Sequence, residues 1–346
     1  MSSHLDSTTD MFGFGGHLSS EVLLTDAGFS PFGVASGPKT TSFATTAFAL
    51  STSTTPTFVT SPGSNLAIDL LWDSSIGSAP AGFKLAVTEA ALTLVQDFST
   101  PLHTIDFIKI GWGEVNGTPL AASALGESES AGYLTNYATV ASVLSSEGVS
   151  LSATNEPVGA QFFLTSAQTK AMGLISGVSG SAASPDGFVG FSTLAGTGKS
   201  WSMGLGAAAN QYNLEGVALH ELTEVMGRIS MEGTFNYLGR PTYTPMDLSD
   251  FSAPGHLALS PSGGYFSSNN GVTHMGNFNN AAAYGGDIGD WASISSVTQS
   301  GTVAANQQDP FDAFTRPGYS LVFPSDDIRL VATLGYLLTA KGAALA

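Results

Sequence analysis

Cysteine is absent from this sequence of 346 residues. Disulfide bonds, thiolate metal sites and cysteine nucleophiles are therefore excluded. Any bound metal has to be held by histidine, by a carboxylate, by tyrosine or by carbonyl oxygen.

Positive charge is also scarce. The chain carries 10 Lys and Arg residues against 27 Asp and Glu residues, which gives a net charge of -17. Nucleic acid and anionic membrane surfaces repel such a chain, so we predict neither as a partner. Long apolar runs are missing too, because no stretch approaches the roughly 20 apolar residues that a membrane-spanning helix needs.

The first residues, "MSSHLDSTTDMFGFGGHLSSEVLL", lack the basic region and continuous apolar run of a cleaved signal peptide. An acidic, cysteine-free chain rich in Gly, Ser and Thr resembles bacterial proteins that a type I-like machinery exports through an uncleaved C-terminal signal. We therefore expect a secreted, extracellular protein, with a cytoplasmic location as the alternative.

Periodic patterns become clear only after residue 62. Residues 1–62 are rich in Ser, Thr, Gly and Phe, and we interpret them as an N-terminal extension with one or two strands. Residues 63–346 are predicted to form one domain. Apolar residues alternate over 65–72 and 103–115 as in strands, and between them 78–98 carries a helical stripe. Strand, helix and strand at this spacing favour a crossover unit and a mixed sheet.

The remaining elements complete an α+β prediction, with a mixed sheet packed on helices and a loop-rich C-terminal half. Ser325 is expected to cap the last helix, with Asp326 and Asp327 in its first turn. The predicted elements are helices over 135–147, 165–175 and 325–340, a strand over 186–193, and a loop over 196–213 followed by a helix from about 214 to 227.

That helix contains the segment "VALHELTEVMGR", residues 217–228. His220 and Glu221 begin it like the zinc-protease motif H-E-x-x-H, but Glu224 stands where the second histidine belongs. Residues four apart lie on one helix face, so His220 and Glu224 can point at one ion. Glu221 lies about 100° around the helix, where a general base beside a metal-activated water is needed.

Glu224 changes the expected chemistry without removing it. Carboxylates are acceptable zinc ligands, but each one offsets part of the charge of the ion. We predict zinc as the cofactor, with Mn or Ca as the alternatives that a carboxylate-rich site favours. A competing interpretation is a purely structural helix, whose core face consists of Leu219, Leu222, Val225 and Met226.

A further ligand has to come from downstream. Ser230 occupies the position of the third ligand in the longer motif H-E-x-x-H-x-x-G-x-x-H, and a serine is a poor ligand. Asp247 follows a tight turn at Pro245 and Met246 and is the residue we predict, against the alternative of a turn or capping aspartate. The other candidates are Asp250, Glu232 and His256.

Residues from about 65 to 337 resemble a family of bacterial, secreted zinc-dependent metalloproteases related to the zincins. The similar segments include "IGWGEVNGTPLAASALGES", "DGFVGFST", "EGVALHELTEVMGR", "YFSSNNGVTHMGNFNN" and "GGDIGDWAS", in the order of the family. The resemblance implies a zincin-like catalytic domain in which His220 is a metal ligand, Glu221 the base, and Glu224 the second helix ligand or its relic. The chain departs from the family pattern at Glu224 and at "DLSDFS", where "DLFRYS" is usual.

Two functions follow as hypotheses. The first is a secreted metal-dependent peptidase that hydrolyses protein or peptide substrates. The second is a non-catalytic structural or adhesive protein that keeps a zincin scaffold. The oxygen-rich segment "GGDIGDW", with Asp287 and Asp290, is interpreted as a Gly/Asp turn, with a calcium loop as the alternative.

Overall fold

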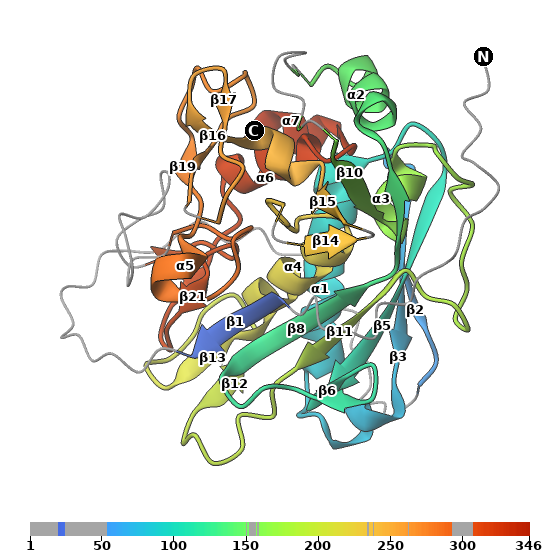
Figure 1. The fold of residues 1–346 in the computed structure, drawn as a ribbon. Helices are drawn as coiled ribbons and strands as arrows, with labels where there is room; N and C mark the ends of the chain where they lie inside the picture. Colours follow the sequence, from blue (N-terminus) through green and yellow to red (C-terminus); the bar gives the residue numbers. More distant parts are fainter. Residues whose placement is uncertain are drawn as a thin grey trace.

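A seven-stranded mixed sheet forms the centre of the protein (Figure 1). The structure is a computed structural model that describes residues 20–24, 54–149, 151, 157, 159–233, 235–237, 239–261, 263–292 and 307–346. The strand order is β2-β3-β5-β11-β8-β1-β21. The bounds are β1 Ser20–Leu24, β2 Thr57–Val59, β3 Leu66–Trp72, β5 Thr104–Trp112, β8 Ala124–Ser130, β11 Gly187–Phe191 and β21 Phe314–Thr315.

The predicted strand-helix-strand unit is confirmed. Strands β3 and β5 pair in parallel from Leu66 opposite Thr104 to Trp72 opposite Ile110. Helix α1 (Phe83–Asp97) connects them and buries the predicted apolar stripe. The sheet is mixed because β11 continues the parallel arrangement beside β5, while its other neighbour β8 is antiparallel.

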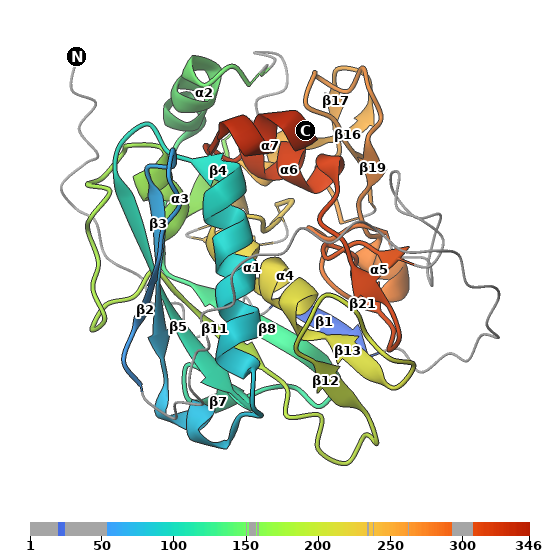
Figure 2. The same ribbon diagram turned by 180° about the vertical axis from the view of Figure 1, so that it is seen from behind.

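Helices α1 and α4 (Leu214–Val225) lie side by side on one face of this sheet, as Figure 2 shows. Helix α4 contacts β8 and β11, and α1 contacts β3. Apolar side chains of the sheet and of both helices form one core together with those of the C-terminal helix α6 (Ser325–Ala332). The segment with the HELTE sequence is thus clamped between the sheet and α1.

Smaller elements surround this core. A second apolar cluster joins α2 (Tyr137–Ser146), β10 (Gln161–Thr165) and β15 (Arg240–Tyr243). The remaining α-helices are α3 Ser166–Ala171, α5 Ala281–Tyr284 and α7 Ala340–Leu345, and short 3-10 helices span Ser74–Ser78 and Met246–Ser249. The remaining strands are β4 Phe98–Ser99, β6 Glu114–Val115, β7 Thr118–Pro119, β9 Gly132–Thr135, β12 Ser200–Ser202, β13 Gln211–Asn213, β14 Phe235–Tyr237, β16 Asp250–Ala253, β17 His256–Leu257, β18 Tyr265–Phe266, β19 Gly276–Asn277, β20 Gln307–Gln308, β22 Ser320–Leu321 and β23 Leu337–Leu338.

The C-terminal segment differs from the prediction of one continuous helix. Helix α6 ends at Ala332, and Gly335 adopts a positive φ of 101° before β23 and α7 begin. A Cβ at Gly335 would meet Met172 Cγ at 2.7 Å, so the chain breaks where it packs closely against α3. Pro324, not Ser325, occupies the N-cap position. The loop predicted over 196–213 also contains the parallel strand pair β12 and β13.

Two strands from the predicted N-terminal extension join the central sheet. Strand β1 pairs antiparallel with β8 and parallel with β21, and β2 pairs antiparallel with β3. Among the described residues, no helix has both the length and the apolar character to cross a lipid bilayer.

Candidate metal centre

The ends of α4 are fixed by local signals in the sequence. Asn213 caps the start, where its side chain accepts a hydrogen bond from the Gly216 N–H at 2.8 Å. Gly227, with φ of 109°, ends the helix. The Gly227 N–H donates to Glu224 O and the Arg228 N–H to Thr223 O, both at 2.9 Å, which is a Schellman motif. This turn folds Arg228 back over the face that carries His220 and Glu224.

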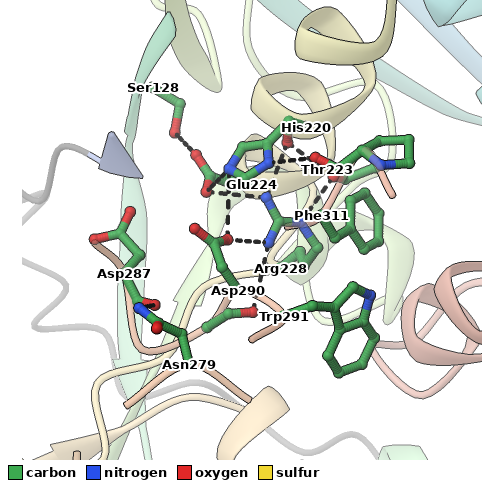
Figure 3. Close-up of polar contacts among 12 residues, drawn as sticks. Ser128, His220, Thr223, Glu224, Arg228, Asn279, Asp287, Asp290, Trp291 and Phe311 are labelled. Carbon is green, nitrogen blue, oxygen red and sulfur yellow. Dashed lines mark hydrogen bonds and ion pairs between the residues drawn. The ribbon is translucent and has the colours of Figure 1, made fainter. Parts of the chain in front are cut away.

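His220 and Glu224 meet on that face, and a third side chain joins them (Figure 3). His220 Nε2 lies 3.1 Å from Glu224 Oε1 and 3.4 Å from Asp290 Oδ1. All three side chains are buried. In a tetrahedral zinc site with metal–ligand distances of about 2.0–2.1 Å, two ligand atoms lie about 3.3 Å from each other. The two observed separations therefore fit a shared metal ion.

The orientation of the His220 ring supports the same interpretation. His220 Nδ1 lies 2.7 Å from the carbonyl oxygen of Pro310, which can only accept, so Nδ1 carries a proton and donates it. Nε2 then faces two carboxylate oxygens, an arrangement that is repulsive unless a proton or a metal cation lies between them. A metal-ligating histidine commonly has its other ring nitrogen bonded to a backbone carbonyl in this way.

Arg228 is a permanent cation within the cluster. Its Nη1 donates to Asp290 Oδ1 at 2.7 Å and its Nη2 to Glu224 Oε1 at 3.0 Å. Its Nε bonds Thr223 Oγ1, and the guanidinium lies 4.2 Å from the ring centre of Phe311. Two carboxylates and one guanidinium leave a surplus of negative charge in a buried place, which attracts a further cation.

The carboxyl groups of the cluster differ in their titration. Burial opposes ionisation of Glu224, but His220 and Arg228 outweigh it and lower its pKa, and Ser128 Oγ donates to Glu224 Oε2 at 2.9 Å. Burial raises the pKa of Asp290 despite His220 and Arg228. Glu224 is therefore the group most readily held as an anion.

Glu221 lies beside the cluster of His220, Glu224 and Asp290, and its side chain faces Gly126 of β8. Burial, followed by the negative charge of Glu224, raises the pKa of Glu221 well above its ordinary value. Its two carboxyl oxygens have no hydrogen-bond donor within the part of the chain that the structure describes. A Cβ at Gly126 of β8 would lie 2.5 Å from Glu221 Oε1, so only a glycine there leaves space for this carboxyl.

Asp247, the predicted third ligand, lies outside the cluster. Its carboxylate accepts from Ser230 Oγ at 2.5 Å and from the backbone N–H groups of Thr244, Glu232 and Met231 at 2.8, 3.0 and 3.2 Å. Burial still raises its pKa to about 6. Asp247 thus holds together the turn after α4, and among the described residues it is Asp290 that lies beside His220 and Glu224.

Asp290 is positioned by contacts that only the folded chain makes. Its backbone carbonyl accepts from the Asn279 N–H at 2.8 Å, and the next residue, Trp291, stacks on Phe278 with a centroid distance of 4.9 Å. Trp291 Nε1 also donates to Asp327 Oδ1 at 2.7 Å. The buried indole anchors the segment "GGDIGDW" and so fixes Asp290 against Arg228.

Comparison with protein-family models, with curated proteins and with solved structures finds no significant match.

Proposed function

We propose that this protein is a metal-dependent peptidase whose metal is held by His220, Glu224 and Asp290. The observation that carries the proposal is the convergence of His220 Nε2 with one oxygen of each carboxylate in a buried place, while Nδ1 is bonded to a carbonyl. Zinc suits this ligand set, and Mn or Ca are the alternatives for a site with two carboxylates.

A metal in this place would supply Lewis-acid activation of a water molecule. Glu221 would accept the proton of that water at its carboxylate, since its oxygens have no other donor among the described residues and it lies one residue from His220. Burial, and then the charge of Glu224, raise the pKa of Glu221 and so favour its protonated form, whereas a nearby divalent cation would favour the ionised form that a base requires. Arg228 would hold both ligand carboxylates in place.

Substitution of Glu221 by Gln tests this mechanism. The variant should keep bound metal, measured by elemental analysis of the dialysed full-length protein, and should lose casein hydrolysis. Glu215→Gln, on the same helix but outside the cluster, is the matched control and should behave like the unmodified protein. Equal proteolysis by the Glu221→Gln variant and the unmodified protein would reject Glu221 as the base.

A second function, a non-catalytic structural or adhesive protein on the same scaffold, is favoured by one specific observation. Arg228 already binds both carboxylates, and every side chain of the cluster is at most 1% exposed, so the ion network can stabilise the fold without metal or substrate. Stable, metal-free protein without proteolytic activity, even after zinc is added, would support this second function.

A further inference from the structure

A second buried ionic cluster lies between α3 and the strands β5 and β11, apart from the carboxylates of α4. Lys170 of α3 places Nζ 2.5 Å from Oδ2 of Asp186, the residue before β11, and 3.4 Å from Oδ1 of Asp106 in β5. The three side chains are 0%, 4% and 0% exposed. The two aspartates make this burial possible, because a lysine is almost never fully buried unless it is paired.

The surroundings hold the Lys170 amine on Asp186. Nζ also donates to the carbonyl oxygens of Ile105 and Ser179, and it lies 5.5 Å from the ring centre of Phe107. Asp186 Oδ2 accepts a second hydrogen bond from the Phe107 N–H at 2.8 Å. Amine and carboxyl are therefore held in contact in a dry place, which is the condition under which two groups react as one unit.

The second carboxyl group, Asp106, lies farther from the Lys170 amine than Asp186 does. Apart from the Lys170 amine at 3.4 Å, neither of its oxygens has a hydrogen-bond donor among the residues that the structure describes, and the buried hydroxyl of Tyr336 has no hydrogen-bond partner among them either. Burial, moderated by Lys170, raises the pKa of Asp106 to about 7. Asp106 is thus able both to release and to accept a proton near neutral pH.

We propose that Lys170 and Asp186 join in an intramolecular isopeptide bond between Nζ and Cγ. One proton passes from the ammonium group to the Asp186 carboxyl, and the neutral amine attacks Cγ. The Nζ–Cγ bond forms, one Cγ–Oδ bond breaks, and the oxygen leaves as water with a second proton that Asp106 relays from Nζ. One ammonium and one carboxylate become one amide and one water, so charge and atoms balance without an oxidant or co-reactant.

Burial favours the products. An ionised pair loses the solvation of water when it is enclosed, whereas an amide carries no net charge and keeps one donor and one acceptor. The bond would tie α3 to the start of β11 in a chain that has no cysteine with which to form a disulfide. This inference does not depend on the metal centre.

Mass spectrometry of the intact, denatured full-length chain tests the bond. The expected mass is lower than the calculated mass by one water. Trypsin should then fail to cleave after Lys170 and should release residues 110–199 as one peptide that contains an internal ring and lacks one water. An unchanged mass with normal cleavage after Lys170 would overturn the proposal.

Loss of water by itself is not sufficient, because Asp186 precedes Gly187 and such a pair can also lose water by closing a succinimide ring. Normal cleavage after Lys170 together with the lost water would assign the loss to that ring and overturn the proposal. A branched product in which residues 85–109, which contain Asp106, are joined to residues 110–199 would overturn it as well. Lys109 and Asp73, an ion pair at 2.8 Å on the surface, are the internal control and should remain unlinked.

Two variants separate the roles of the carboxyl groups. Asp186→Asn should still form the amide but lose ammonia in place of water, since the leaving group has changed. Asp106→Asn should keep the Lys170 contact and show the full calculated mass, because the proton relay is gone. A cross-link at wild-type yield in Asp106→Asn would remove Asp106 from the reaction.

Discussion

Arg228 Nη2 donates to Glu224 Oε1 across 3.0 Å, from just beyond the end of the helix that carries Glu224. The same oxygen lies 3.1 Å from His220 Nε2. A carboxylate in this position is neutralised in part before any metal arrives, so the fold does not require the ion in order to bury Glu224. A metal would share the carboxylates with Arg228 and offset the negative charge that remains.

Substitution of Arg228 by Met is expected to destabilise the protein strongly. It removes one partner of a buried ion network and leaves Glu224 and Asp290 without their guanidinium, a change that typically costs about 3–5 kcal/mol. Denaturant unfolding measures the loss of unfolding free energy.

Arg329→Met is the control. The Arg329 side chain is 42% exposed in its ion pair with Asp326, and such surface pairs contribute only about 0–1 kcal/mol to the free energy of unfolding. Added zinc should restore part of the stability of Arg228→Met, and an unfolding curve equal to that of Arg329→Met would contradict the network described here.

The identity of the third ligand can be decided by a pair of Asp→Asn variants. Asp290→Asn should weaken zinc binding by at least the ~10–100-fold that the loss of an outer-shell partner causes. Asp247→Asn should bind zinc like the unmodified protein but unfold more easily, since Asp247 accepts four hydrogen bonds in the turn after α4. Competition with a chromogenic chelator gives both affinities. The reverse order of affinities would restore Asp247 as the ligand.

The elements that could be predicted from the sequence are those with a local periodic signal. The unit β3-α1-β5 has regular apolar spacing in each member, and α4 has a cap, a positive-φ glycine and apolar residues at helical intervals. The apolar pattern over 325–340 does not reveal the break in the last helix, where α6 ends at Ala332 and Gly335 adopts a positive φ close to Met172.

The sequence places Asp290 in a Gly/Asp turn or a calcium loop, but its position beside His220 and Glu224 is not predicted, for a related reason. It lies in a Gly-rich turn without periodicity, and its position depends on the burial of Trp291 far along the chain from α4. One signal was present in the sequence. Arg228 follows His220 and Glu224 at the same spacing of four, and an arginine next to two such residues implies a carboxylate partner elsewhere in the chain.

Stability should fall as the pH rises from about 4 towards neutrality. Burial, and then the hydrogen bond and charge of Asp250, raise the pKa of Glu232 to about 11, and burial raises that of Asp250 to about 7. Folded protein therefore binds protons that the unfolded chain has released, so this contribution is complete below the unfolded pKa values and is lost as the pH passes through the folded ones.

Glu232→Gln isolates this pair. Its amide can still donate to Asp250 but binds no titrating proton, so the slope of unfolding free energy against pH should become flatter by about 1.4 kcal/mol per pH unit for each proton no longer taken up. Denaturant unfolding between pH 4 and 7 measures the slope. Parallel curves for the variant and the unmodified protein would show that Glu232 and Asp250 do not share a proton.

Gly227 forms the turn that brings Arg228 back to Glu224 and Asp290, and its substitution by Ala tests the role of that turn. The positive φ of 109° disfavours any side chain, and a Cβ would lie 2.7 Å from Cδ of Gln168, which is buried and held by its own hydrogen bond to Leu334 O. Together these two effects should lower the free energy of unfolding by roughly 2–4 kcal/mol. Gly63→Ala is the matched control, because Gly63 also has a positive φ, of 85°, but has open space around it. It should show only the backbone contribution of about 1–2 kcal/mol. Equal losses for the two variants in thermal unfolding would mean that the contact with Gln168 does not fix this turn, and that Arg228 is positioned by its carboxylate partners alone.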